Sequence, residues 1–285
     1  MTSRRSFLGR ATAAVAAAAA WPGVARAAGP VKPPLGLQLW SLRKELEADL
    51  AGTLAQIKAW GIDEVEAAGY AGRPVAEFAA ALAKAGLRCR SMHVGWELLE
   101  TKLDGSLRDA DVLGVTTLVN PSLPRAGRVA TREEILRAAG AFAKWSARCR
   151  AAGKRFGYHM HGHEFGPAPE GTLFDVLAKE AGPDVGFEID VFWAVMGGAD
   201  PVKLMGQHQG RFWYTHLKDM AKGIVVGEAA QHRDDANVPL GTGQLDIKGI
   251  VAAGPKAGVE IHYLEDESAA PVANIPKSVA FYKAL

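Results

Sequence analysis

The chain has 285 residues, with 33 Lys and Arg against 31 Asp and Glu, and a formal net charge of +2. Four of the arginines lie in residues 1–27, which contain no acidic residue, so residues 28–285 carry a net charge of −2. With no long basic run in this remainder, the composition argues against a surface that binds nucleic acid.

Residues 1–27 have the order of an export signal. Arg4 and Arg5 precede an alanine-rich apolar run over residues 11–20, which is followed by the small-residue site Ala25-Arg26-Ala27. The pattern S-R-R-x-F-L resembles a signal read by the twin-arginine translocation machinery. A retained membrane anchor is the alternative, but the apolar run is shorter than the ~20 residues of a span. We expect cleavage after Ala27, no membrane span in the mature chain 28–285, and a periplasmic or secreted location.

Strand-like and helix-like segments alternate from residue 35 onward. Residues 50–60, for example, place apolar side chains at 50, 54, 57 and 60, which is the spacing of one helix face. Eight repeats of this alternation in ~250 residues predict an α/β fold, a single-domain (β/α)8 TIM barrel. An open doubly wound sheet is the alternative, but the first strand lacks its glycine fingerprint. The predicted strands are residues 35–40, 63–69, 88–96, 116–121, 155–161, 185–190, 212–219 and 260–266.

One connection is much longer than the others. Residues 221–245 follow the seventh predicted strand and are rich in Gly, Asp and Asn. A loop of this length in a compact domain is usually functional or disordered. We therefore expect a partial lid over the face that carries the chemistry.

Polar residues gather near the carboxyl ends of the predicted strands, where TIM barrels place their chemistry. Because side chains alternate along a strand, His159 and His161 share one face, as do Glu188 and Asp190. Imidazole and carboxylate groups from separate strands can converge on one divalent ion, and such a mixed set suits Mn, Zn, Fe or Co. The polar set includes Gln38, Glu66, His93, Asn120, His159, His161, Glu188, Asp190, His216, Lys218 and Glu265.

Four segments resemble the xylose-isomerase-like barrels of sugar isomerases and epimerases, including secreted members with twin-arginine signals. They are YHMHGHEF (158–165), GFEIDVFW (186–193), THLKD (215–219) and YLEDE (263–267). The resemblance extends over the whole chain after the signal. It implies one divalent metal ion with ligands from strands 5 to 8, usually Glu, Asp, His and Glu. Asp190, His216 and Glu265 match the last three ligand positions.

The first ligand position departs from the family. Where relatives have glutamate on strand 5, this chain has His159, and His161 two residues later faces the same way. We expect His159 to be the fourth metal ligand, with His161 as the alternative.

The same departure bears on the reaction. In the family's epimerases two glutamates flank the substrate, and they remove and return a proton next to a carbonyl. Glu265 can serve as one base here, whereas the other role falls to Glu164, to a histidine such as His161, or to no residue. The resemblance therefore implies a metal-dependent sugar isomerase or epimerase. The alternative is a lyase or dehydratase of keto-sugars or keto-inositols, chemistry found in relatives with a histidine-rich strand 5.

Further residues are expected to contact a small sugar substrate. They are Gln38, His93, Glu188, Lys218 and Trp193, the last because flat aromatic rings stack on sugar faces. Two other classes of function compete with an enzyme of proton transfer. A periplasmic sugar-binding protein would need no metal, and a metal-dependent endonuclease is disfavoured by the acidic balance. The sequence does not specify an oligomeric state.

Overall fold

Eight parallel strands close into a barrel in a computed structural model that describes residues 32–226 and 236–285. The barrel order is β1-β12-β9-β8-β5-β4-β3-β2, and each neighbouring pair is parallel. This confirms the (β/α)8 TIM barrel, and each predicted strand segment contains one barrel strand. The strands are β1 (Leu35–Gln38), β2 (Glu64–Ala67), β3 (Arg88–His93), β4 (Thr117–Asn120), β5 (Arg155–Met160), β8 (Val185–Asp190), β9 (Phe212–Leu217) and β12 (Ile261–Leu264).

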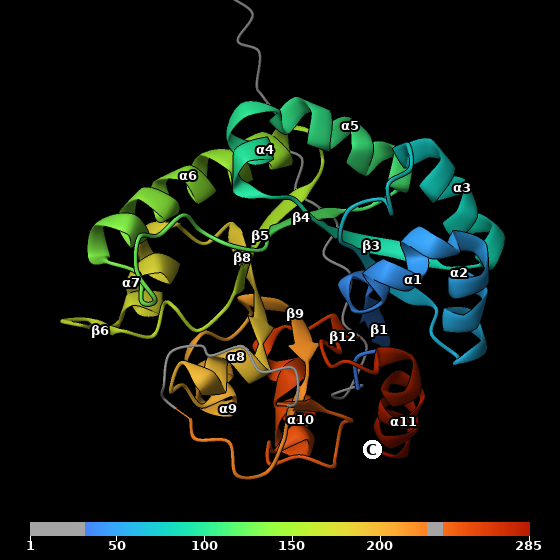
Figure 1. Ribbon diagram of the computed structural model, residues 1–285. Coiled ribbons are helices and arrows are strands. Elements are labelled where there is room, and N and C mark those ends of the chain that lie inside the picture. Colours follow the sequence, from blue (N-terminus) through green and yellow to red (C-terminus); the bar gives the residue numbers. More distant parts are fainter. Residues whose placement is uncertain (1–31, 227–235) are drawn as a thin grey trace, which may run out of the picture. The chain divides into compact units, whose positions relative to one another are not determined.

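Helices surround the barrel on its outer side (Figure 1). Two short antiparallel pairs lie outside the barrel, β6 (Pro167–Ala168) with β7 (Gly171–Thr172) and β10 (Asp219–Met220) with β11 (Asn237–Val238). The helices are η1 (Leu39–Leu42), α1 (Arg43–Ala48), α2 (Leu50–Ala59), α3 (Val75–Ala85), α4 (Trp96–Thr101), α5 (Leu103–Leu113), α6 (Arg132–Ala151), α7 (Leu173–Glu180), α8 (Val191–Met196), α9 (Pro201–Gln207), α10 (Ile247–Ala257) and α11 (Pro271–Ala284).

Helix ends follow local signals in the sequence. The side chain of Thr131 accepts from the backbone N–H of Glu134, whose carboxylate reaches back to Thr131, so a capping box starts α6. Asp200 caps α9, and Pro201 occupies its first turn. Gly86 ends α3 with φ 71°, a left-handed conformation that glycine adopts at little cost.

The alternation of side chains along each strand divides the interior into two layers. Tyr158 points outward from β5 and packs 4.8 Å, centroid to centroid, from Phe142 of α6. His159, the next residue, points into the barrel and is also buried. The outward side chains thus build the helix–sheet core, whereas the inward ones near the strand ends are free to be polar.

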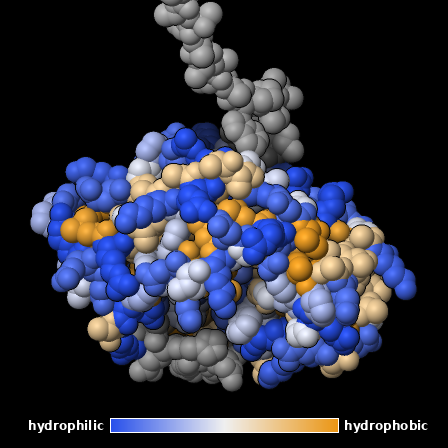
Figure 2. Space-filling view, turned by 90° about the horizontal axis from the view of Figure 1, so that it is seen from above, coloured by the Kyte–Doolittle hydropathy of each residue, from blue (hydrophilic) through white to orange (hydrophobic). Residues whose placement is uncertain are grey.

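On the flank formed by α4, α5 and α6, hydrophobic residues lie among hydrophilic ones (Figure 2). Among the residues described, no helix has the length and hydrophobicity needed to cross a membrane. Arg4, Arg5 and the rest of the expected signal lie outside these residues, so its cleavage remains an expectation.

The long connection after β9 is only partly described. Its two described ends pair as β10 and β11, and residues 227–235 lie outside the description, so the expected lid is not tested. The far end of the connection is held by Asp219. Its carboxylate accepts hydrogen bonds from the backbone N–H groups of Met220, Gly241, Gly243 and Leu245. Four backbone donors on one carboxylate fix this turn beside the barrel mouth.

Candidate metal centre and active site

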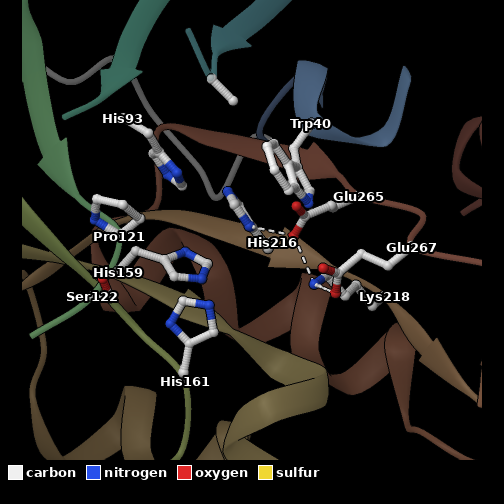
Figure 3. A pocket seen from close by; sticks show the side chains of 11 residues that line it. Trp40, His93, Pro121, Ser122, His159, His161, His216, Lys218, Glu265 and Glu267 are labelled. Carbon is white, nitrogen blue, oxygen red and sulfur yellow. Dashed lines mark hydrogen bonds and ion pairs between the residues drawn. The ribbon is translucent and has the colours of Figure 1, made fainter. Parts of the chain in front are cut away.

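A cavity of about 410 Å³ lies at the carboxyl end of the barrel strands, where the sequence predicted the site. Side chains from β3, β5, β9 and the segment after β12 converge on it (Figure 3). Its volume is within the range of small-molecule sites. The lining residues are Trp40, Ala68, His93, Pro121, Ser122, His159, His161, His216, Lys218, Glu265 and Glu267.

Asp190, His216 and Glu265, the positions that the family resemblance indicated, lie close enough together to be candidate ligands of one metal ion. His216 Nδ1 lies 2.8 Å from Glu265 Oε2 and 4.0 Å from Asp190 Oδ2. His159 Nε2 approaches the same Asp190 oxygen at 3.8 Å. Two atoms that each lie ~2.1 Å from one ion are at most ~4.2 Å apart, so these separations fit a shared ion.

Asp190 provides the clearest sign that a cation fits here. Its Oδ1 accepts from the backbone N–H of Trp193 at 3.0 Å, which fixes the carboxylate at the start of α8. Its Oδ2 is buried and receives no hydrogen bond of good geometry from the described residues, although the Lys218 ammonium lies 3.0 Å away as an ion-pair partner. A buried carboxylate oxygen with an incomplete set of donors is well suited to coordinate a metal.

A second group forms around Glu188. Its Oε2 lies 2.9 Å from His93 Nε2, 3.0 Å from His159 Nδ1 and 3.1 Å from His216 Nε2. These four residues also meet the distance requirement for a metal-binding group. However, His159 and His216 each turn one ring nitrogen to Glu188 and the other toward Asp190. A carboxylate that accepts from one imidazole N–H leaves the opposite nitrogen for a metal, so Glu188 is suited to orient both rings.

Two residues predicted to bind substrate do not reach the cavity in the structure. Glu188 and Gln38 are fully buried and do not line the cavity. Gln38 donates from Nε2 to Glu66 Oε1 at 2.6 Å, and Glu66 Oε1 is in turn 2.8 Å from His216 Nε2. Both side chains lie behind the cavity wall. Glu188 contacts the histidines of the wall directly, and Gln38 contacts Glu66, which in turn contacts His216.

Lys218 lies directly against the proposed ligands. Its Nζ is 3.0 Å from Asp190 Oδ2 and 2.7 Å from Glu265 Oε2, and it also donates to Glu267. Burial alone would lower the pKa of Lys218, but Asp190, Glu265 and Glu267 raise it well above its usual range. Burial would raise the pKa of Glu265, but Lys218 and His216 outweigh it and hold the pKa well below normal. The cavity therefore contains a charged ammonium beside an ionised carboxylate.

Of the two other residues predicted to be catalytic, one lines the cavity and the other does not. His161 lines the cavity, its ring centroid 4.4 Å from that of His159. Burial, followed by the charge of His159, lowers the pKa of His161 well below 6.5, so the ring is neutral. Glu164 is fully buried, accepts a hydrogen bond from Tyr158 on the outward face of β5, and does not line the cavity. The structure therefore does not bring Glu164 to the substrate.

Of the other residues predicted to contact the substrate, His93 lines the cavity and Trp193 does not. His93 lines the cavity, and burial would lower its pKa, but Glu66 and Glu188 raise it to about 9. Trp193 is 7% exposed and lies behind the wall, with its ring centroid 5.9 Å from Lys218 Nζ. Glu267 was not predicted, although it stands two residues after Glu265 and lines the same wall.

Comparison with protein-family models and with curated protein sequences found no match. Among solved structures, a sugar phosphate isomerase/epimerase from Parabacteroides distasonis is 26% identical, with a TM-score of 0.74 over 89% of this chain and 98% of its own. The probable 3-DHS dehydratase AsbF from Bacillus anthracis is 14% identical, with a TM-score of 0.70 over 88% and 98%. The IOLI protein, solved with a bound zinc atom, is 15% identical, with a TM-score of 0.67 over 88% and 95%. The structural neighbours of this chain are therefore sugar isomerase/epimerase and other xylose-isomerase-like TIM barrels.

Proposed function

We propose that the protein is a divalent-metal-dependent sugar isomerase or epimerase that moves a proton next to the carbonyl of a sugar or keto-sugar. One observation carries the proposal. Glu265 belongs to the Asp190–His216–Glu265 ligand group and also lines the cavity beside the charged Lys218. A carboxylate in that position can both hold a cation and reach a bound substrate.

The residues of the chain have distinct roles in this proposal. His159, Asp190, His216 and Glu265 would hold the ion, which when bound polarises a carbonyl oxygen as a Lewis acid. Glu265 is ionised and can accept a proton from the carbon next to that carbonyl. Lys218 places a positive charge where negative charge develops on the substrate oxygen. His161 enters the cavity from a different side than Glu265 (Figure 3), where a neutral imidazole can exchange a proton.

A lyase or dehydratase is the second candidate, and a specific feature of the cavity favours it. Among the described residues that line the cavity, the carboxylates are Glu265 and Glu267, and both follow β12. The wall formed by β3 and β5 presents His93, His159 and His161 instead. Epimerisation by two facing carboxylates would need a carboxylate there, whereas elimination needs one base and an acid for the leaving group.

The test measures deuterium exchange at the carbon next to the carbonyl. Purified protein loaded with Mn, Zn, Fe or Co is incubated with a panel of keto-sugars in D₂O. Deuterium at an inverted carbon next to the carbonyl identifies an epimerase, and loss of water or of a substituent identifies a lyase. Glu265→Gln should abolish exchange, whereas the matched Glu260→Gln, which precedes β12 at its other end, should not. If the purified protein contains no stoichiometric metal and a chelator does not change its sugar binding, it is instead a non-catalytic sugar-binding protein.

We also propose that the chain is exported by the twin-arginine machinery. The support is the order of Arg4-Arg5, apolar run and Ala25-Arg26-Ala27. Fractionation of cells that express the chain should recover the mature form, residues 28–285, outside the cytoplasm. Replacing both arginines with lysine should leave the full-length chain inside.

A further inference from the structure

A second cavity of about 260 Å³ adjoins the candidate active site. Trp40 and Ala68 line both cavities, so they form a shared wall. The two spaces are therefore neighbours, with Trp40 between Lys218 and Glu265 on one side and the second cavity on the other.

The second cavity combines apolar and polar side chains. Leu46, Ala71 and Phe78 give it an apolar side, whereas Lys44 and Glu47 give it polar groups. Both polar side chains are exposed, and within the part of the chain that the structure describes no ion pair or side-chain hydrogen bond holds them, so they are free to turn toward a ligand. A pyranose ring has apolar faces and a rim of hydroxyl groups, so it matches a space of this mixed kind.

Trp40 stands at the junction of the two cavities. It is 45% exposed, which is unusual for a tryptophan beside an otherwise buried site. Arg43, the first residue of α1, lies over the indole ring at 4.5 Å and donates to the carbonyl of Trp40 in η1, so both contacts favour one orientation of the ring. An exposed indole between two cavities of mixed lining suits stacking on a sugar ring.

We propose that the second cavity is a subsite for a second sugar ring, and hence that the substrate is a two-ring sugar such as a disaccharide or glycoside. The reacting ring occupies the cavity beside Glu265, and the other ring lies beyond Trp40 against Lys44 and Glu47. The inference rests on the proposed function of the main cavity. Arg43 and Lys44 face the single carboxylate of Glu47 on this wall, so an anionic group such as a phosphate is the competing ligand that the test must exclude.

The test uses binding and turnover with the metal-loaded protein. Calorimetric titration compares glucose, a panel of glucose disaccharides and glucose 6-phosphate, none of which needs to react. We expect at least one disaccharide to bind more tightly than glucose. The double variant Lys44→Ala/Glu47→Ala should weaken that binding about tenfold, the loss expected for two hydrogen bonds. It should leave glucose binding unchanged, as should a matched surface variant, Lys248→Ala/Glu133→Ala.

The outcomes separate this proposal from the proposed function. Equal affinity for glucose and every disaccharide, or a double variant that binds both like the wild type, overturns the second-ring subsite. Tighter binding of glucose 6-phosphate that the double variant weakens overturns it in favour of an anion site. The corresponding keto-sugars are then tested for deuterium exchange. Exchange in the one-ring keto-sugar without any disaccharide preference leaves the proposed function standing, whereas disaccharide binding without exchange refutes only the chemistry.

Discussion

His216 Nε2 lies 2.8 Å from Glu66 Oε1, although β9 and β2 are not neighbours in the barrel. Glu66 is itself held by hydrogen bonds from Gln38 and Ser91, so its carboxylate has a fixed position. The contact directs the other ring nitrogen of His216 toward Asp190 and Glu265. A residue outside the ligand set thereby sets the orientation of a ligand.

The substitution Glu66→Gln should weaken metal binding by about 10- to 100-fold, as loss of a partner behind a ligating histidine typically does. The amide keeps the size of the side chain but not its charge, so the imidazole is oriented less firmly. Competition with a chelator of known affinity measures the effect. Glu64→Gln, at the other end of β2 where the carboxylate pairs with Arg88, is the matched control. Equal affinity in Glu66→Gln and the wild type would show that Glu66 has no part in the centre.

The choice between His159 and His161 is open to a simple measurement. His159 approaches Asp190 with Nε2 and Glu188 with Nδ1, whereas His161 has no such carboxylate contact among the described residues. We therefore expect His159→Ala to lose most of its bound metal after dialysis, and His161→Ala to retain close to one ion per chain. Elemental analysis of both variants decides the matter, and the reverse result would make His161 the ligand. His159→Glu, which installs the carboxylate of the family, should restore binding.

The fold could be predicted from the sequence because it depends on local periodicity. The spacing of apolar residues defines helices such as α2, and the short runs between them define the eight barrel strands. The family resemblance indicated Asp190, His216 and Glu265, which lie close together in the structure, whereas His159 groups with His93, Glu188 and His216. Closure of the barrel, by contrast, brings Glu66 to His216, and no pattern along the chain records that contact.

Two of the misplaced residues, Glu164 and Trp193, lie beyond the ends of their strands, where side-chain alternation no longer applies. β5 ends at Met160, and Gly162 then turns the chain with φ 83°. Glu164 was expected to reach the substrate from beyond the strand, whereas the turn sends its carboxylate to Tyr158. Trp193 similarly lies in the first turn of α8, where helical geometry replaces strand alternation and carries the ring behind the wall.

Lys218→Met should bind the divalent ion more tightly while it turns over more slowly. The ammonium lies within 3.0 Å of oxygens of both Asp190 and Glu265, so it repels an incoming cation and competes for its ligands. Methionine removes the charge but roughly preserves the volume. If Lys218 also stabilises the developing oxyanion, kcat should fall about 100-fold, as for loss of one such donor. Parallel measurement of metal affinity and kcat tests both parts, and weaker metal binding in the variant would contradict the first.

A histidine far from the site should control stability in acid. His262 is buried between β12 and the helices, where Nδ1 lies 2.6 Å from Thr215 Oγ1 and Nε2 has no hydrogen-bond partner among the described residues. Burial, and then the charge of Lys32, lowers its pKa from 6.5 to about 3. Because the folded state holds the neutral form, the stabilisation is complete above pH 6.5 and is lost as the pH falls toward 3. One proton taken up on unfolding corresponds to about 2 kcal/mol between pH 6 and pH 4.5.

Urea unfolding of metal-free protein at these two pH values measures the change. His262→Gln lacks the titrating ring, so its free energy of unfolding should fall by about 2 kcal/mol less than that of the wild type over the same interval. The comparison cancels the contributions of carboxylates that titrate in both proteins. Parallel pH dependence in the two proteins would mean that His262 is protonated in the folded state, and that the buried Nε2 finds a partner there.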